Sequence, residues 1–187
     1  MTASLIIAAS EVDSNLYYAC RFIAPDPFVL LQVGGRKILL MSDLEVDRAR
    51  QQARVDEVLS LSEWEAKAKQ RWTQPRLTDT VSLLLEDYGV PTVEVPADFP
   101  LEAADRLRER GVTVQVRPHP FFPERVIKSA EEVAAIEQAQ RHTESALAAA
   151  LDVLRQSVVR GDEGGAAVGL HETANPFNGD GFGVANR

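Results

Sequence analysis

The feature that most constrains the fold is a helix–glycine–strand unit that occurs twice in succession. The unit spans residues 79–95 and again residues 100–116, with Gly89 and Gly111 each standing between a predicted helix and a predicted strand. The end of a helix favours a left-handed backbone, which glycine adopts readily. Strands that alternate with helices in this way predict an α/β sheet covered by helices on both faces.

A β-hairpin is predicted earlier in the chain. Two apolar runs, residues 28–33 and 36–41, flank the pair Gly34-Gly35, and glycine supplies the positive φ angles that a tight two-residue turn requires. The remaining elements expected before the first repeat unit are a buried strand at residues 3–9, a short helix at 16–22, a helix from Ser42 to about Ala53 that begins with a Ser42–Glu45 capping box, a strand at 55–60 and a helix at 63–72.

The last third of the chain changes character. Ser129 and Glu132 have the spacing of a second capping box, which predicts a long helix from Ser129 to about Ser157. Polar Gln140 and Thr143 interrupt its apolar stripe, so we expect part of the stripe to lack a partner. The stripe consists of Val133, Ile136, Leu147, Leu151, Leu154 and Val158.

Glycine is concentrated beyond this helix, where 7 of the chain's 11 glycines fall. We therefore expect a flexible tail. The predicted organisation has three parts: an N-terminal domain at residues 1–128, a linker helix at 129–158 and a Gly-rich tail at 159–187.

Composition excludes several classes of function. The 187 residues carry a formal net charge of -8, which disfavours binding to nucleic acid or to an anionic membrane as the main role. No apolar run approaches the roughly 20 residues that a membrane-spanning helix needs. Cys20 is the only cysteine, so it cannot form an internal disulfide, and no signal-peptide pattern is present. We predict a cytoplasmic protein.

The three histidines do not form a recognisable metal site. His119 lies between two prolines, where a loop role is expected. His142 and Glu144 are two residues apart on a helix, so they point to different faces and cannot bind one ion together. His171-Glu172 resembles the start of a zinc-binding helix, but Asn175 stands where the second histidine would be needed.

Other candidate groups have structural explanations. Asp43, Glu45 and Asp47 lie at the start of a predicted helix, where acids favour the helix dipole. The Gly-rich segment 179–183 lacks the strand, the helix and the lysine of a phosphate loop. Cys20 is expected in the core. Core packing is likewise expected for the aromatic residues Tyr17, Tyr18, Phe22, Phe28, Trp64, Trp72, Phe121 and Phe122, the last two of which could instead pack on a neighbouring domain. We assign no catalytic, cofactor-binding or metal-binding residue.

Two motifs resemble a known family. The segment Asn15-Leu-Tyr-Tyr-Ala19, followed by the hairpin and by Leu40-Met-Ser-Asp-Leu-Glu45, resembles the N-terminal domain of the creatinase, prolidase and aminopeptidase P family. The segment Arg125-Val-Ile-Lys-Ser-Ala-Glu-Glu-Val-Ala-Ala-Ile136 is similar to the junction at which that domain joins the "pita-bread" metallopeptidase domain. The resemblance covers roughly residues 3 to 158 and implies a ribonuclease H-like α/β domain with a mixed sheet.

The resemblance also implies where the chemistry of the family resides. In the C-terminal domain of the family, two Asp, one His and two Glu hold two divalent cations, Mn or Co, and a bridging water attacks the peptide bond before proline. None of these five ligands has a matching position in this sequence, and we expect the chain to stop before that domain. A two-ion site needs several converging carboxylates, so we expect the chain alone to be inactive.

Three hypotheses about function follow. The resemblance implies a non-catalytic gating or oligomerisation domain of an Xaa-Pro aminopeptidase or dipeptidase, whose partner is the pita-bread catalytic domain or another subunit, with homo-oligomers possible. An alternative is a stand-alone interaction or regulatory protein that dimerises through its long helix. A small-molecule-binding α/β domain ranks last, because no phosphate loop supports it.

Overall fold

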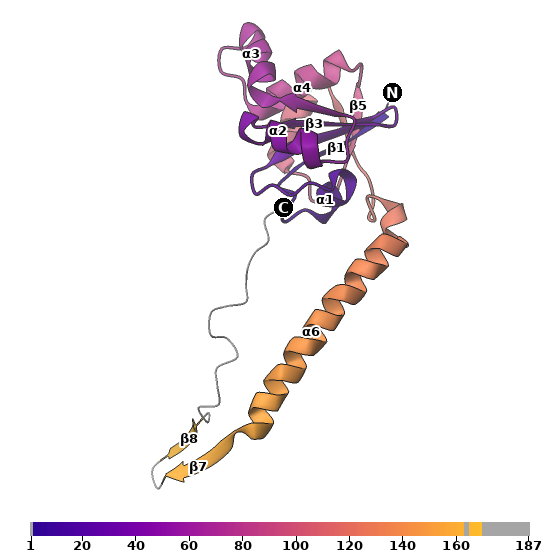
Figure 1. Cartoon of the computed structure of the whole chain (residues 1–187). Helices are drawn as coiled ribbons and strands as arrows, with labels where there is room; N and C mark the ends of the chain where they lie inside the picture. Colours follow the sequence, from indigo (N-terminus) through magenta and orange to yellow (C-terminus); the bar gives the residue numbers. More distant parts are fainter. Residues whose placement is uncertain (1, 163–164, 170–187) are drawn as a thin grey trace. The chain divides into compact units, whose positions relative to one another are not determined.

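The computed structural model describes residues 2–162 and 165–169, and the chain divides into two compact units, Met1–Ile127 and Lys128–Arg187 (Figure 1). The first unit is a globular α/β domain, called here the globular unit. The second contains one long helix and a short hairpin.

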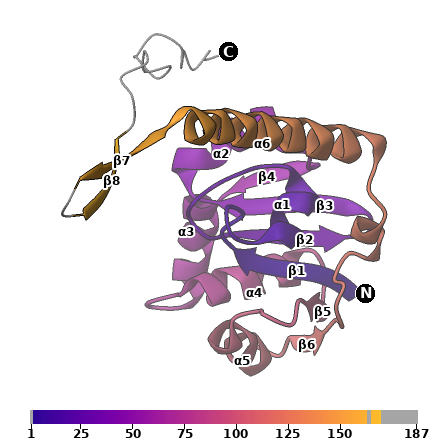
Figure 2. The same ribbon diagram turned by 90° about the horizontal axis from the view of Figure 1, so that it is seen from below.

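A six-stranded mixed sheet forms the centre of the globular unit, and its strands lie side by side in Figure 2. Strand β1 is antiparallel to β2, and β2 is antiparallel to β3, whereas β4, β5 and β6 join through parallel pairs. The α/β fold with a mixed sheet that the sequence predicts is therefore confirmed. In the spatial order of the sheet the strands are β4 (Glu57–Ser60), β3 (Arg36–Met41), β2 (Phe28–Val33), β1 (Thr2–Ala8), β5 (Thr92–Val95) and β6 (Thr113–Val116).

The hairpin between β2 and β3 forms as its glycines predict. Gly34 and Gly35 have φ values of 59° and 81°, which lie in the left-handed region that side chains disfavour. Val33 pairs directly with Arg36 across the turn. The tight turn fixes the register in which the apolar residues of both strands face the two layers of helices.

Helices cover both faces of this sheet, as predicted. Figure 1 shows α3 and α4 on one side of the strands and α1 on the other. The helices of the globular unit are α1 (Ser14–Cys20), α2 (Asp43–Gln52), α3 (Leu61–Arg71), α4 (Leu77–Asp87) and α5 (Leu101–Glu109).

Successive residues of the central strands alternate between two separate cores. Leu5 and Leu31 pack in the first core, with residues of α3, α4 and α5, whereas Ile6 and Leu30 pack in the second, with residues of α1 and α2. All four side chains are almost completely buried. Because side chains alternate across a strand, one continuous apolar run supplies both layers.

The expected capping box at Ser42 is wrong. The Ser42 side chain accepts no capping hydrogen bond, and the Glu45 carboxylate pairs with Arg48 instead. The neighbouring Asp43 carboxylate accepts hydrogen bonds from the hydroxyls of Ser60 and Ser62, each at 2.5 Å. The start of α2 is therefore tied to the start of α3.

The second unit begins with α6 (Ala130–Gln156), which has the predicted capping box. The Ser129 hydroxyl accepts from the Glu132 amide at 3.2 Å, and the Glu132 carboxylate accepts from the Ser129 amide at 3.0 Å. The helix ends at Gln156, so Val158, which the sequence analysis placed in the apolar stripe, lies outside it.

Beyond α6, β7 (Val158–Asp162) and β8 (Gly165–Gly169) pair antiparallel. They are the only part of the predicted Gly-rich tail, residues 159–187, that the structure describes. The remainder of that tail lies outside the described residues, and its flexibility stays a prediction.

Candidate functional site

The two family-like motifs, 110 residues apart in sequence, meet at the end of the globular unit. The guanidinium of Arg125 donates a hydrogen bond to Asn15 Oδ1 at 2.5 Å and lies 5.6 Å from the ring centroid of Tyr18. Helix α1 holds both partners, and Asp13 caps that helix by accepting from the Leu16 amide at 2.6 Å. The start of α1 thus binds the segment that leads to α6. We call this contact the Arg125 latch.

Two aromatic side chains anchor the same segment. Phe121 and Phe122 are buried in the second core. Their ring centroids lie 4.9 Å apart, and the ring centroid of Phe122 lies 5.8 Å from that of Tyr18. The sequence analysis considered that they could pack on a neighbouring domain, but they pack inside their own unit. Arg117 adds a polar contact, because its Nε donates to Glu94 at 2.8 Å and its Nη1 donates to the Phe121 carbonyl at 3.2 Å.

The apolar stripe of α6 is the second candidate surface. None of the residues of α6 is buried, and the five apolar side chains of the stripe are between 39% and 61% exposed. At 3.6 residues per turn they lie within about 60° of one another around the helix axis. These residues, called here the α6 stripe, are Val133, Ile136, Leu147, Leu151 and Leu154.

The two polar residues that interrupt the α6 stripe have partners within the helix. The amide of Gln140 donates to Glu144 Oε1 at 3.0 Å, and the hydroxyl of Thr143 donates to the Ala139 carbonyl at 3.0 Å. Covering this face would therefore keep the Thr143 hydroxyl and one N–H of the Gln140 amide paired, and unpaired donors are the expensive outcome of burying a polar group. The interruption is compatible with a docking surface.

Local interactions stabilise α6. Besides its capping box, Glu137 pairs with Arg141 and Asp152 with Arg155, and such pairs contribute about 0.2–0.5 kcal/mol each. Burial of an apolar face contributes far more than such pairs to most protein helices. A partner on the α6 stripe would supply that contribution.

The described residues contain no group of three or more His, Cys, Asp or Glu side chains that could hold a metal ion. His119 is exposed and His142 lies on exposed α6. Cys20 is buried, as expected, and burial raises the pKa of its thiol. The candidates His171-Glu172 and residues 179–183 lie outside the described residues.

The acids near the start of α2 have structural partners. Asp43 is held by Ser60 and Ser62, and these hydrogen bonds lower the pKa of its carboxyl. Asp47 pairs with Arg50 at 3.5 Å. The sequence analysis attributed these acids to the helix dipole, and the hydrogen bonds of Asp43 to α3 are an additional role that only the fold reveals.

Asp79 is a buried carboxylate that the sequence analysis missed. Its side chain is only 5% exposed and lies 2.7 Å from the Arg110 guanidinium. Burial by itself would raise the pKa of Asp79, but hydrogen bonds from the Arg76 amide and from Arg110 outweigh it, and the pKa is lowered. Asp79 is the third residue of α4, where an acid that accepts from the amide of the residue before the helix is a local signal of a helix start.

Trp72 differs from the sequence-based expectation. Trp64 is buried in the first core, but Trp72 follows the last residue of α3 and is only partly buried. It lines a cavity together with Arg71 and Arg110. The sequence analysis placed Trp72 inside its helix at residues 63–72, whereas α3 ends at Arg71.

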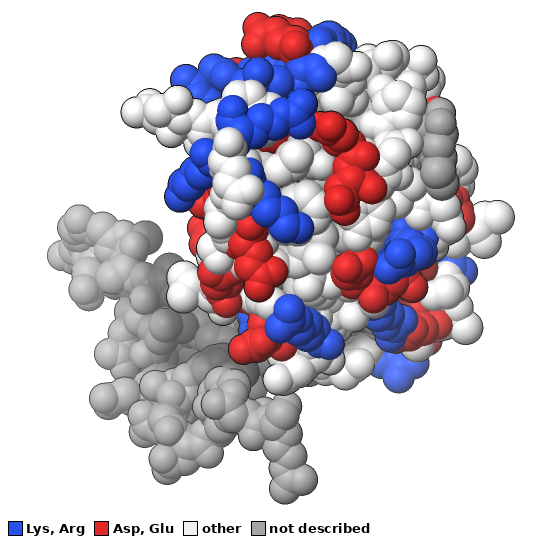
Figure 3. All heavy atoms as spheres, turned by 90° about the horizontal axis from the view of Figure 1, so that it is seen from above, with Lys and Arg blue, Asp and Glu red and all other residues white. Residues whose placement is uncertain are grey.

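Acidic and basic side chains lie next to one another over the face shown in Figure 3. Ion pairs of opposite charge occur in the globular unit, including Arg76 with Glu102 and Arg108 with Asp105. This face therefore has no electrostatic field of a single sign.

No helix of the described residues is both long and apolar enough to cross a bilayer.

Sequence comparison and structure comparison give different results. No model of a known protein family matches the sequence, and no curated protein matches it either. Solved structures do match. An X-Pro aminopeptidase from Thermotoga maritima MSB8 is 16% identical and superposes with a TM-score of 0.64 over 83% of this chain and 41% of its own.

Two further structures give the same picture. The prolidase from Pyrococcus horikoshii OT3 is 17% identical, with a TM-score of 0.61 over 87% of this chain and 41% of its own. The Xaa-Pro dipeptidase from Bacillus anthracis is 16% identical, with a TM-score of 0.62 over 84% of this chain and 40% of its own. The chain thus shares its fold with part of these structures and spans about two fifths of their length.

Proposed function

We propose that this chain is the non-catalytic N-terminal domain of an Xaa-Pro aminopeptidase- or dipeptidase-like metallopeptidase. One observation carries the proposal. Each superposition covers most of this chain but only about two fifths of the matching structure. The meeting of the two family-like motifs at the Arg125 latch supports it. Fold similarity alone does not transfer an activity, so the proposed role rests on the Arg125 latch and the α6 stripe.

The described residues do not suit the two cations of such an enzyme. They bring no three ligating side chains together, whereas a two-ion site needs several carboxylates to neutralise and fix the metals. In this proposal the cations, Mn or Co, belong to a catalytic domain that these residues do not form. The globular unit would then act in gating or in assembly.

In this proposal α6 is the element that contacts the catalytic domain. The Arg125 latch fixes the segment just before α6 to the globular unit, and the α6 stripe offers an apolar face without buried contacts. Burial of apolar area stabilises such an interface by about 25 cal/mol per Å². The same surfaces would let the domain limit access to a neighbouring active site.

A peptidase assay tests the inactive part of this proposal. Purified chain is incubated with an Xaa-Pro dipeptide and with Mn²⁺ or Co²⁺, and a blank contains the metal alone. We expect no hydrolysis above the blank. Turnover that saturates at stoichiometric metal would refute the proposal, since it would require a metal site within this chain.

The coding sequence around this chain provides a second test. If the chain is one domain of such an enzyme, an adjacent open reading frame should encode two Asp, one His and two Glu in the order typical of the family. Neighbouring sequence with no such set would argue for the second candidate.

That second candidate is a stand-alone interaction protein that dimerises through α6, and the exposed α6 stripe favours it. Sedimentation of the chain tests this candidate, because it requires a discrete dimer held by the α6 stripe, and a monomer would refute it. The double variant Leu147→Ser/Leu151→Ser should abolish such a dimer. The control Val153→Ser changes an exposed apolar side chain on the opposite side of the same helix and should leave the dimer intact.

A further inference from the structure

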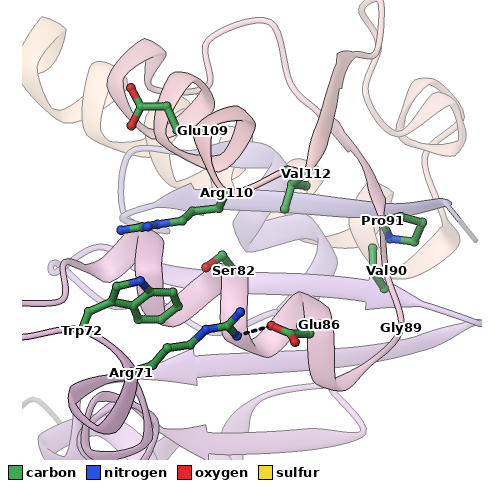
Figure 4. Close-up of a pocket in the computed structure, with 11 residues that line it drawn as sticks. Arg71, Trp72, Ser82, Glu86, Gly89, Val90, Pro91, Glu109, Arg110 and Val112 are labelled. Atoms are coloured by element: carbon green, nitrogen blue, oxygen red, sulfur yellow. Dashed lines mark hydrogen bonds and ion pairs between the residues drawn. The ribbon is translucent and has the colours of Figure 1, made fainter.

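The globular unit contains a cavity of about 770 Å³ beside the C-terminal ends of α3, α4 and α5. Figure 4 shows Arg71 and Trp72 at one end of it and Pro91 and Val90 at the other. Glu86 lies between these two ends. The cavity therefore has one end rich in cationic groups and one apolar end.

The cationic end is organised by Trp72. The guanidinium carbons of Arg71 and Arg110 lie 5.0 and 4.7 Å from the ring centroid of Trp72, and in Figure 4 the two side chains approach the indole from different sides. Stacking on an aromatic ring restrains a guanidinium and leaves the N–H groups at its edge available. Two arginines are thus held at one wall of the same cavity.

Each arginine has an acidic partner, but the two pairs differ in exposure. Arg110 contacts Asp79 through Nε and Nη2; the carboxylate is only 5% exposed, whereas the Arg110 side chain is 37% exposed and reaches the cavity. Arg71 contacts Glu86 at 2.5 Å, and these side chains are 53% and 63% exposed. An exposed ion pair contributes only about 0–1 kcal/mol. Glu86 can therefore be displaced from Arg71 at little cost.

The apolar end has a simple origin in the fold. Val90, Pro91 and Val112 follow the helix ends at Gly89 and Gly111 and line the cavity. The amides of Val90 and Val112 donate to helix carbonyls at 2.8 and 3.0 Å, so neither is an unpaired donor. Val90 and Val112 are buried in the first core, and the apolar side chain exposed at this wall is that of Pro91. It suits the apolar body of a ligand.

We propose that this cavity binds a small organic oxyanion, a carboxylate or phosphate carried on an apolar body. The oxyanion accepts hydrogen bonds from Arg71 and Arg110, and the apolar body lies against Pro91, with Val90 and Val112 behind it in the first core. Glu86 occupies Arg71 when no ligand is bound and swings away when the oxyanion replaces it. The inference is independent of the proposed function.

The test uses phenylacetate and phenyl phosphate as probes and follows the indole N–H signal of Trp72 in a ¹H–¹⁵N NMR spectrum of the full chain. The spectrum of Trp64→Phe assigns the two indole signals. We expect a saturable shift of the Trp72 signal with at least one probe, and the stronger of the two identifies carboxylate or phosphate as the preferred group. Benzylamine, which has the ring but the opposite charge, should cause no saturable shift.

Three variants make the test specific. Glu86→Gln removes the competing acid and should tighten binding about two- to fivefold. Arg71→Gln should weaken binding about tenfold or more, because it removes a charged hydrogen-bond donor. Arg108→Gln, an exposed arginine outside the cavity, should change nothing.

Three results would overturn the proposal. The first is no saturable shift with either probe in the millimolar range. The second is weaker binding to Glu86→Gln than to the unchanged protein, because Glu86 would then be a ligand and not a competitor. The third is binding of acetate or inorganic phosphate that is as tight as the binding of phenylacetate or phenyl phosphate, which would show that the apolar wall has no part in recognition.

Discussion

The globular unit and α6 use apolar residues in opposite ways. In the globular unit, the central strands place Leu5, Leu30 and Leu31 in two cores with almost no exposed surface. In α6, Leu147 and Leu154 keep more than half of their surface exposed. The first region therefore buries its own apolar residues, whereas the second leaves them exposed.

The largest expected difference between the two regions concerns leucine truncation. Leu31→Ala should lower the free energy of unfolding by about 2–5 kcal/mol, because it opens a cavity in the first core. Leu147→Ala should change it by no more than about 0.5 kcal/mol, because its side chain is exposed. Urea denaturation followed by far-UV circular dichroism, which senses both units, measures both. Equal losses would contradict the comparison.

The second largest difference is expected in the pH dependence of stability, which Asp79 gives to the globular unit. The lowered pKa of Asp79 means that its contribution to stability is present above the unfolded pKa, near 3.8, and is lost as the pH falls through the lower folded value. Asp79→Asn should cost about 1–3 kcal/mol at neutral pH and should make stability less dependent on pH below about 5. Helix α6 contains no buried acid.

Urea denaturation of both proteins between neutral pH and acid, followed by tryptophan fluorescence, measures this effect, because both tryptophans lie in the globular unit. Glu102→Asn, at an exposed acid that pairs with Arg76 and Arg106, is the control. An acid dependence of Asp79→Asn as steep as that of the unchanged protein would show that Asp79 is not responsible.

The boundary between the regions depends on the Arg125 latch. Arg125→Ala removes the contacts to Asn15 and Tyr18 and should lower stability by about 1.5 kcal/mol. Amide hydrogen exchange in residues 117–127 should accelerate. Arg36→Ala, which breaks an exposed pair with Glu57, should have a smaller effect. If both variants behave alike, the latch does not fix the segment before α6.

The smallest expected effect is on helix stability at the first residues of α6 and α2. Ser129→Ala removes the cap of α6 and should cost about 1 kcal/mol of helix stability. Ser42→Ala should cost only a few tenths, because the Ser42 side chain makes no capping hydrogen bond. Hydrogen exchange in the first turns of α6 and α2 measures the two effects. A larger effect at Ser42 would contradict the hydrogen bonds described here.

Local sequence patterns predicted most of the elements, for physical reasons. The glycine pair at residues 34–35 and the capping box at Ser129 depend on contacts within a few residues, and both form. The capping box at Ser42 has the same local pattern but does not form, because Glu45 pairs with Arg48, and Arg48 also donates to the Ile23 carbonyl, 25 residues away. Local propensity does not include such competing partners.

The candidate surfaces could be predicted only in part. Helical periodicity identified the α6 stripe, because it depends on spacing alone. The Arg125 latch was not predicted, although both of its motifs were noticed, because the contact with Asn15 spans 110 residues. The position of Trp72 between Arg71 and Arg110 depends on how α3 and α5 pack, which the sequence pattern does not specify.

Hydrogen exchange of the full chain at monomeric concentration compares α6, which has no buried residue, with α4, which has several. Exchange protection follows the free energy of local opening, which depends on buried contacts. We expect the amides of α4 to stay protected while those of the central turns of α6 exchange orders of magnitude faster, and a partner on the α6 stripe should slow them. Equal protection of α4 and α6 in the monomer would contradict this expectation, because α6 would then be stabilised without a partner.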